Sequence, residues 1–278
     1  MMVMPYDEAR LLLVLQIDHS RVTGLFAAHW GNAEFAVPTP YAPMVLAAQE
    51  HDGGWWEWEV QPTLNAQGHP IDYVNSGLPR EIWVEGYANG VRRIADRDPY
   101  AGLIACMHAI GLCNQGYGLL PYMMNRMEVP VVAEFVREQE LLRAELLDEV
   151  RRSERYAPYA TEDHVWTNFK LMEVYDQLGQ FVCNRYPFDS PWRKNGPSPT
   201  LSDVPVPLGP GRADTEIAVE PQDATRAIVR PYPFDVEPLE VPFQGRLVSS
   251  EPYTDRETFL RDYYKAERVN ITYTLHAS

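Results

Sequence analysis

Positive charge is scarce in this sequence. The 278 residues include only three lysines, and lysines and arginines together number 24 against 39 acidic residues. The net charge of −15 and the pI of about 4.9 argue against nucleic acid and anionic membrane surfaces as partners, because both are polyanionic. We therefore expect a small-molecule substrate.

Long apolar runs are also missing. None approaches the roughly 20 residues of a membrane-spanning helix, and the run 11–15 is too short for the apolar segment of a signal peptide. Three cysteines, Cys106, Cys113 and Cys183, lie in apolar, helix-like surroundings without metal-site spacing, which indicates buried free thiols in a reducing compartment. These features predict a cytoplasmic protein. They leave its oligomeric state open and are compatible with a homodimer.

Several common catalytic motifs are absent as well. The sequence has no glycine-rich phosphate loop, no G-x-S-x-G nucleophile elbow and no C-x-x-C pair. Chemistry must therefore come from histidines and carboxylates, which lie far apart along the chain.

Apolar residues recur at helical spacing through most of the first 185 residues. Helices are predicted at about 21–30, 44–52, 80–96, 99–112, 130–152 and 161–184. The composition then changes, because twelve of the 24 prolines lie between Pro187 and Pro242. Strand-like segments follow at 227–230, 239–241, 246–248 and 269–275, with a short helix at 255–267. We expect a mainly α fold: a helical metal-binding core over 1–185, then a proline-rich connection and a small β-containing lobe over 186–278 that packs on the core.

The candidate metal ligands lie on four of these helices. His51 and Asp52 end an apolar helix just before two glycines, and His19 begins a core-facing stripe. Asp176 falls in the middle of a buried stripe, where an unpaired carboxylate costs several kcal/mol. His108 is the only ionisable residue of an almost wholly apolar helix. Imidazole nitrogens and carboxylate oxygens together suit a divalent transition metal or zinc.

Each candidate also has a purely structural interpretation. His51 and Asp52 can be an ordinary helix end, His19 and His108 can be packed core histidines, and Asp176 can be half of a buried ion pair with an arginine.

An aromatic cluster follows the His-Asp pair directly. Trp55, Trp56 and Trp58 lie within a few residues of the two ligands, so we expect at least one of them to line a substrate pocket. Glu57 and Glu59 are candidate acids or bases at the same place. Alternatively, the indoles close the end of the helical core.

These residues resemble two related groups of proteins. His19-Ser20, His51-Asp52-Gly53 and Tyr175-Asp176-Gln177-Leu178 resemble the H…HD…D pattern of the HD-domain superfamily. More narrowly, the chain resembles the uncharacterised DUF3891 family in the segments 16–19, 28–31, 50–55, 99–101 and 107–108. The superfamily resemblance implies an all-α fold, metal-dependent phosphohydrolase activity with a branch of diiron oxygenases, and metal ligation by His19, His51, Asp52 and Asp176.

Two departures from the superfamily pattern stand out. The long gap between Asp52 and Asp176 implies inserted helices. The Trp-rich segment after Gly54 implies that the mouth of the site differs from that of a generic nucleotidase.

The leading prediction is hydrolysis of a phosphate ester by a metal-bound water, with Asp52 and His108 as catalytic residues. The cofactor is one divalent ion, with Fe, Mn, Zn and Ni all compatible with the ligands. The alternatives are an HD-type diiron oxygenase, in which His108 joins a second metal, and a non-catalytic small-molecule-binding HD protein.

Overall fold

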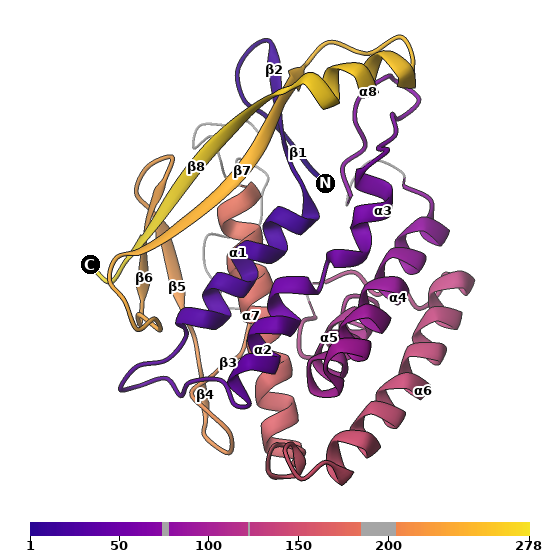
Figure 1. Ribbon diagram of the computed structural model, residues 1–278. Coiled ribbons are helices and arrows are strands. Elements are labelled where there is room, and N and C mark those ends of the chain that lie inside the picture. The colour runs from indigo at the N-terminus through magenta and orange to yellow at the C-terminus, as the bar shows by residue number, and fades with distance from the viewer. Residues whose placement is uncertain (74–77, 122, 185–203) are drawn as a thin grey trace.

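The computed structural model describes residues 1–73, 78–121, 123–184 and 204–278 (Figure 1). The chain is about 48% helical with 19% strand, and a six-stranded mixed sheet curls into a half-barrel. The fold is therefore α/β, and the predicted mainly α class was wrong. The error arose because the strands were assigned to a small appended lobe, whereas they form one continuous sheet that also includes the beginning of the chain.

The predicted helices are present with small shifts at their ends. They are α1 (Gln16–His29), α2 (Tyr41–Glu50), α4 (Arg80–Arg97), α5 (Pro99–Gly111), α6 (Pro130–Arg152), α7 (Glu162–Asn184) and α8 (Arg256–Lys265). One short helix, α3 (Trp56–Glu59), was not predicted. Two 3₁₀ turns, η1 (Gly53–Trp55) and η2 (Ala157–Tyr159), connect them. Within the described ranges, none of these helices has the length and apolar character needed to cross a membrane.

The large sheet joins the two ends of the described chain. Its order is β1-β2-β7-β8-β6-β5, and only the β6–β8 pair is parallel. The strands are β1 (Met2–Pro5), β2 (Arg10–Val14), β5 (Ala218–Pro221), β6 (Arg226–Arg230), β7 (Leu239–Ser249) and β8 (Glu267–His276), and β3 (Val206–Pro207) pairs separately with β4 (Asp214–Thr215).

Residues on both sides of the predicted boundary at 185 therefore share one sheet. In the β2–β7 ladder, Leu12 lies opposite Leu247. The division into two units stays a prediction, and most of the expected proline-rich connection, residues 185–203, lies outside the described residues.

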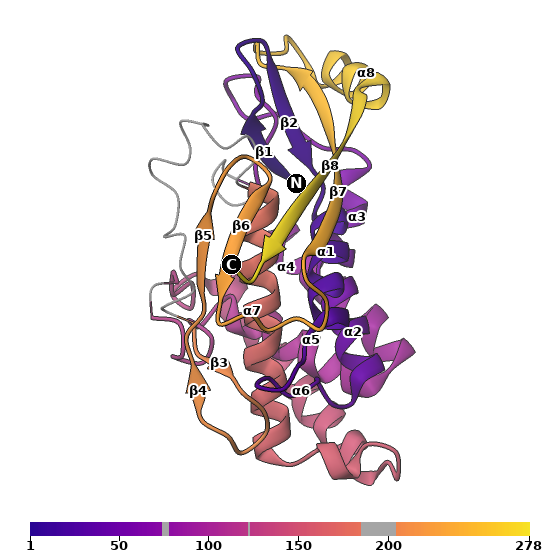
Figure 2. The same cartoon turned by 90° about the vertical axis from the view of Figure 1, so that its left-hand side faces the viewer.

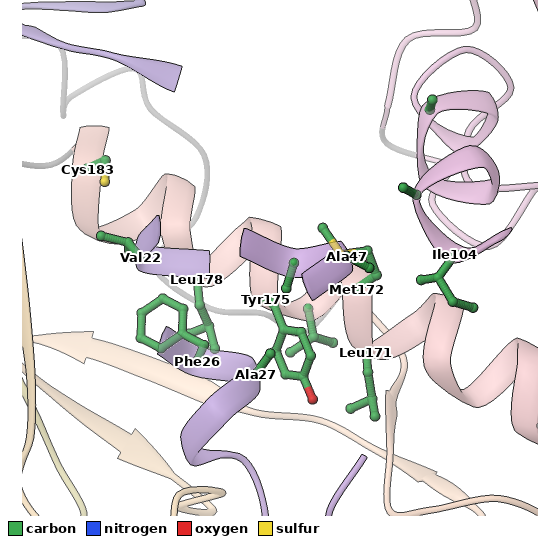
Figure 3. Packing of buried hydrophobic residues seen from close by; sticks show 14 of the residues in the cluster. Val22, Phe26, Ala27, Ala47, Ile104, Leu171, Met172, Tyr175, Leu178 and Cys183 are labelled. Carbon is green, nitrogen blue, oxygen red and sulfur yellow. The ribbon is translucent and has the colours of Figure 1, made fainter. Parts of the chain in front are cut away.

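The sheet covers α1 and α7, which form the middle of the molecule (Figure 2). Val22 and Phe26 of α1 pack near Tyr175 and Leu178 of α7 in the hydrophobic core (Figure 3). Because α2 and α5 pack against these helices as well, polar residues on their inner faces converge at one buried place.

Helix α5 is central to this core and begins with a strong cap. The Asp98 carboxylate accepts hydrogen bonds from the backbone N–H groups of Tyr100 and Ala101, and Pro99 occupies the first helical position. Every residue from Tyr100 to Gly111 is buried, which places His108 in the interior.

We expected the two glycines after Asp52 to end the preceding helix, but the structure gives one of them another function. Neither Gly53 nor Gly54 has a positive φ. A Cβ atom on Gly54 would lie 1.8 Å from the carbonyl oxygen of Gly86 in α4. Gly54 is therefore required because η1 crosses α4 backbone to backbone, and this crossing holds the His51–Asp52 segment in place.

Candidate metal centre

Four predicted ligands from three parts of the fold meet in the interior. His19 comes from the second turn of α1, His51 and Asp52 follow α2, and Asp176 lies in the middle of α7. Their exposed fractions are 0%, 3%, 2% and 6% respectively. The sequence therefore identified a real buried cluster.

The distances between the candidate ligand atoms fit one metal ion. His19 Nε2 lies 2.8 Å from Asp176 Oδ1, and His51 Nε2 lies 3.5 Å from the same oxygen. Asp52 Oδ2 lies 3.4 Å from His51 Nε2 and 3.9 Å from His19 Nε2. For metal–ligand bonds of about 2.1 Å, neighbouring ligand atoms stand roughly 3.0 Å apart in octahedral and roughly 3.4 Å apart in tetrahedral geometry. His19, His51 and Asp176 can thus hold a metal ion, and Asp52 lies within reach of the same point.

The hydrogen bonds of His51 leave a nitrogen free for a metal. Its Nδ1 lies 2.8 Å from the carbonyl oxygen of Ala48, which can only accept, so Nδ1 carries the proton. Its Nε2 is buried, has no hydrogen-bond partner among the described residues, and faces Asp52 and Asp176. An imidazole fixed in this tautomer by a backbone carbonyl is the usual state of a metal-binding histidine.

Electrostatics favour a positive charge at this point. Burial opposes protonation of His51, but the Asp52 and Asp176 carboxylates outweigh it and raise the pKa of His51 well above its ordinary value. Burial likewise opposes ionisation of Asp176, yet its hydrogen bond with His19 and the nearby imidazole of His51 bring its pKa well below the usual range. Without a metal, a proton on His51 therefore supplies the charge that the two carboxylates require.

Helix packing at His19 depends on a glycine. A Cβ atom on Gly179 of α7 would lie 2.6 Å from Cε1 of His19 and 2.7 Å from Oγ1 of Thr23. Gly179 follows Asp176 by about one helical turn, so both residues lie on the same face of α7. This face supplies the Asp176 carboxylate and also leaves space for the His19 ring.

His108 lies beside this cluster and has its own carboxylate partner. Its ring packs edge to face on that of His51, with 5.2 Å between centroids. Its Nδ1 lies 2.7 Å from Oε1 of Glu173. The second carboxylate oxygen, Oε2, is buried and has no partner in the part of the chain that the structure describes. Burial opposes protonation of His108, but Glu173 more than offsets it and raises the pKa of the imidazole.

A family model described as "Protein of unknown function (DUF3891)" matches residues 1–250. The chain belongs to the DUF3891 family. No curated protein and no solved structure matches it. The narrower of the two predicted resemblances is thus confirmed, while membership in the HD-domain superfamily stays a prediction.

The sequence did not single out two other polar residues of this DUF3891 centre, Gln16 and Glu173. Glu173 precedes Asp176 by three residues, and Gln16 precedes His19 by three, so helical spacing was the available signal for both. The Gln16 side-chain amide donates to Asp52 Oδ2 at 2.9 Å, and its backbone N–H donates to Glu59 Oε1 at 2.7 Å. Glu59 is buried, and burial raises the pKa of its carboxyl group.

The four predicted pocket residues divide into two pairs. Trp55 and Trp58 are buried, whereas Trp56 is 49% exposed. Glu57 is exposed and forms an ion pair with Arg93, which lowers the pKa of its carboxyl group. Trp56 and Glu57 therefore lie on the outer side of α3, whereas Trp58 of α3 and Trp55 of η1 face the interior.

Two tyrosines accompany the inner pair. The Trp55 ring packs against Tyr87 and Tyr73, with centroids 5.6 Å and 6.3 Å away. Burial raises the pKa of both tyrosines, and the charges of Asp52 and Asp176 raise it further. The aromatic group thus lies beside the metal ligands.

Proposed function

We propose that this DUF3891 protein is a metal-dependent hydrolase that cleaves a phosphate ester of a small organic molecule. The supporting observation is the set of four buried nitrogen and oxygen atoms with neighbouring distances of 2.8 to 3.9 Å. The order of the ligands along the chain, His19, His51-Asp52 and Asp176, resembles the HD pattern, and a relationship to that superfamily is part of the proposal.

The ligand set suits Fe, Mn, Zn or Ni, because imidazole and carboxylate groups accept all four. A divalent ion held there supplies a Lewis acid, which lowers the pKa of a coordinated water towards about 7. Asp52 Oδ1 is buried and has no hydrogen-bond partner among the described residues, so it is available to orient that water and accept its proton.

His108 is the proton donor for the leaving group in this proposal. Its Nδ1 proton is held by Glu173, because a carboxylate accepts and fixes the ring orientation. The raised pKa of His108 favours the protonated imidazole, whose Nε2–H can donate to the ester oxygen. Trp55 and Tyr73 provide flat apolar surfaces for the organic part of the substrate.

Metal content is the first test. Protein purified without chelators should contain about one equivalent of a divalent ion by elemental analysis, and Asp176→Asn and His51→Gln should lose most of it. His29→Gln is the matched control, because His29 also pairs with an aspartate, Asp235, but is partly exposed and lies at the opposite end of α1 from His19. Retained metal in both ligand variants would refute the centre.

Activity is the second test. A panel of aryl and alkyl phosphate esters, assayed with each metal, should reveal hydrolysis that Asp176→Asn abolishes. His108→Gln should keep its metal while kcat falls by about 10²-fold or more, which is typical for the loss of a general acid. Hydrolysis that is unchanged by His108→Gln would exclude the acid role.

One observation favours a second candidate function. His108 and the unpartnered Oε2 of Glu173 place one more nitrogen and one more oxygen beside His51, as a second metal requires. An oxygen-dependent diiron enzyme would contain two equivalents of iron, and loss of His108 would reduce this to one. Oxygen consumption without phosphate release would support this candidate against the hydrolase.

A further inference from the structure

A separate cavity of about 190 Å³ is lined by residues of α5, α6 and α7 and of the segment that joins α6 to α7. These three helices are shown in Figure 1. None of the candidate metal ligands lines it, and neither do His108 and Glu173. Its apolar wall consists of Met107, Leu147, Val165 and Trp166.

The apolar wall is fixed in position. Met107 and Val165 are buried. The Trp166 ring is held by edge-to-face contacts with Tyr117 and Phe169, at 5.3 Å and 5.5 Å between centroids. An indole positioned in this way offers a rigid flat surface, which costs little conformational entropy when a ligand binds.

Two guanidinium groups complete one side of the cavity. Arg143, Leu147 and Arg151 occur at intervals of four residues, so they form a single stripe on α6 that faces the cavity. Arg143 donates its Nε–H to Glu140 at 2.7 Å. Its terminal N–H groups therefore remain available as donors to a ligand. Among the described residues, Arg151 forms no ion pair, in contrast to its neighbour Arg152, which pairs with Asp148.

Arg151 lies in the last turn of α6, where the helix dipole favours a positively charged side chain. The dipole does not explain why this side chain lines a cavity. The two arginines place positive charge beside an apolar wall in a chain with a net charge of −15. Glu162 lies at the same cavity and is exposed. Its negative charge disfavours ligands with several negative charges.

We propose that this cavity binds a small organic monoanion with a flat apolar body, such as an aryl carboxylate. The aromatic body packs on Trp166 and Met107, and the carboxylate lies against Arg151 and the terminal N–H groups of Arg143. This site is independent of the metal centre and of the proposed hydrolysis.

The test uses ligand-observed NMR on the full chain with four probes. 3-Phenylpropionate should bind in the millimolar range expected for a ligand of this size. Acetate lacks the apolar body, benzylamine carries the opposite charge, and phenylsuccinate carries a second negative charge. All three should bind more weakly by about tenfold or more, and benzylamine binding as tightly as 3-phenylpropionate would overturn the proposal.

Three variants identify the charged groups involved. Arg151→Gln should weaken 3-phenylpropionate binding about tenfold. Arg152→Gln, which removes the same charge one residue away but outside the cavity, should leave it unchanged. Glu162→Gln should strengthen it, because the repulsive charge is removed. Equal losses in both arginine variants, or weaker binding after Glu162→Gln, would overturn the assignment.

Discussion

Replacing Gly179 by alanine tests whether helix packing positions the metal ligands. The new Cβ atom would lie 2.6 Å from Cε1 and 2.9 Å from Nδ1 of His19. Carbon atoms in ordinary contact are about 3.5–4.0 Å apart, so the His19 ring must move by about 1 Å. Ligand positions in metal sites tolerate only about 0.2 Å.

We therefore expect Gly179→Ala to weaken metal binding about 10- to 100-fold, as changes next to a ligand do. Overpacking should also cost roughly 1–3 kcal/mol of unfolding free energy. Calorimetric titration of the metal-free protein measures the affinity, and urea unfolding measures the stability.

Gly53→Ala is the matched control for this substitution. It adds a methyl group directly after Asp52, but its nearest contact is Oε2 of Glu50 at 3.5 Å. Metal affinity should stay at the wild-type value. If Gly179→Ala bound metal as tightly as Gly53→Ala, His19 would not be a ligand positioned by α7.

Two further results are expected. Gly54→Ala should cost at least about 3 kcal/mol in urea unfolding, since its Cβ would meet the backbone oxygen of Gly86 at 1.8 Å; stability near that of Gly53→Ala would contradict the close crossing. Because the pKa of His51 is raised, a metal must displace a proton from this imidazole at pH values below that pKa. Metal affinity should therefore rise about tenfold per pH unit and level off above the pKa. Calorimetry in buffers of different ionisation enthalpy should detect about one released proton, and an affinity independent of pH would exclude His51 as a ligand.

Much of the centre was predictable from the sequence because burial makes charged residues conspicuous. Asp176 occupies an apolar helical stripe, where only a metal or strong partners offset its desolvation. The structure supplies His19 and His51 as those partners, and no arginine pairs with Asp176 in the described part of the chain.

Glu173 was missed for a physical reason. It lies beside Met172 on the edge of the same stripe, and a carboxylate there is ordinarily solvated. Only the approach of α5 buries it against His108. That approach is a tertiary contact, which helical spacing alone does not encode.

The sheet escaped prediction for a similar reason. The apolar run 11–15 is typical of a buried strand or of an extended lead-in, but the strand with which it pairs lies near the other end of the chain. Short strands such as β5 carry too few alternating residues to be separated from loops. Strand pairing across such a distance depends on the whole fold.

The pairing of β2 with β7 also sets the order of events during synthesis. Ser250, directly after β7, donates a hydrogen bond to the backbone of Glu8, 242 residues earlier. At translation rates of about 5–20 residues per second, β2 leaves the ribosome on the order of 12–48 s before its partner is made. Throughout that interval the apolar strand Leu11–Val14 keeps an unpaired edge, which is prone to aggregation. We therefore expect the nascent chain to depend on chaperones until β7 emerges, and the sheet to be the last part of the molecule to form.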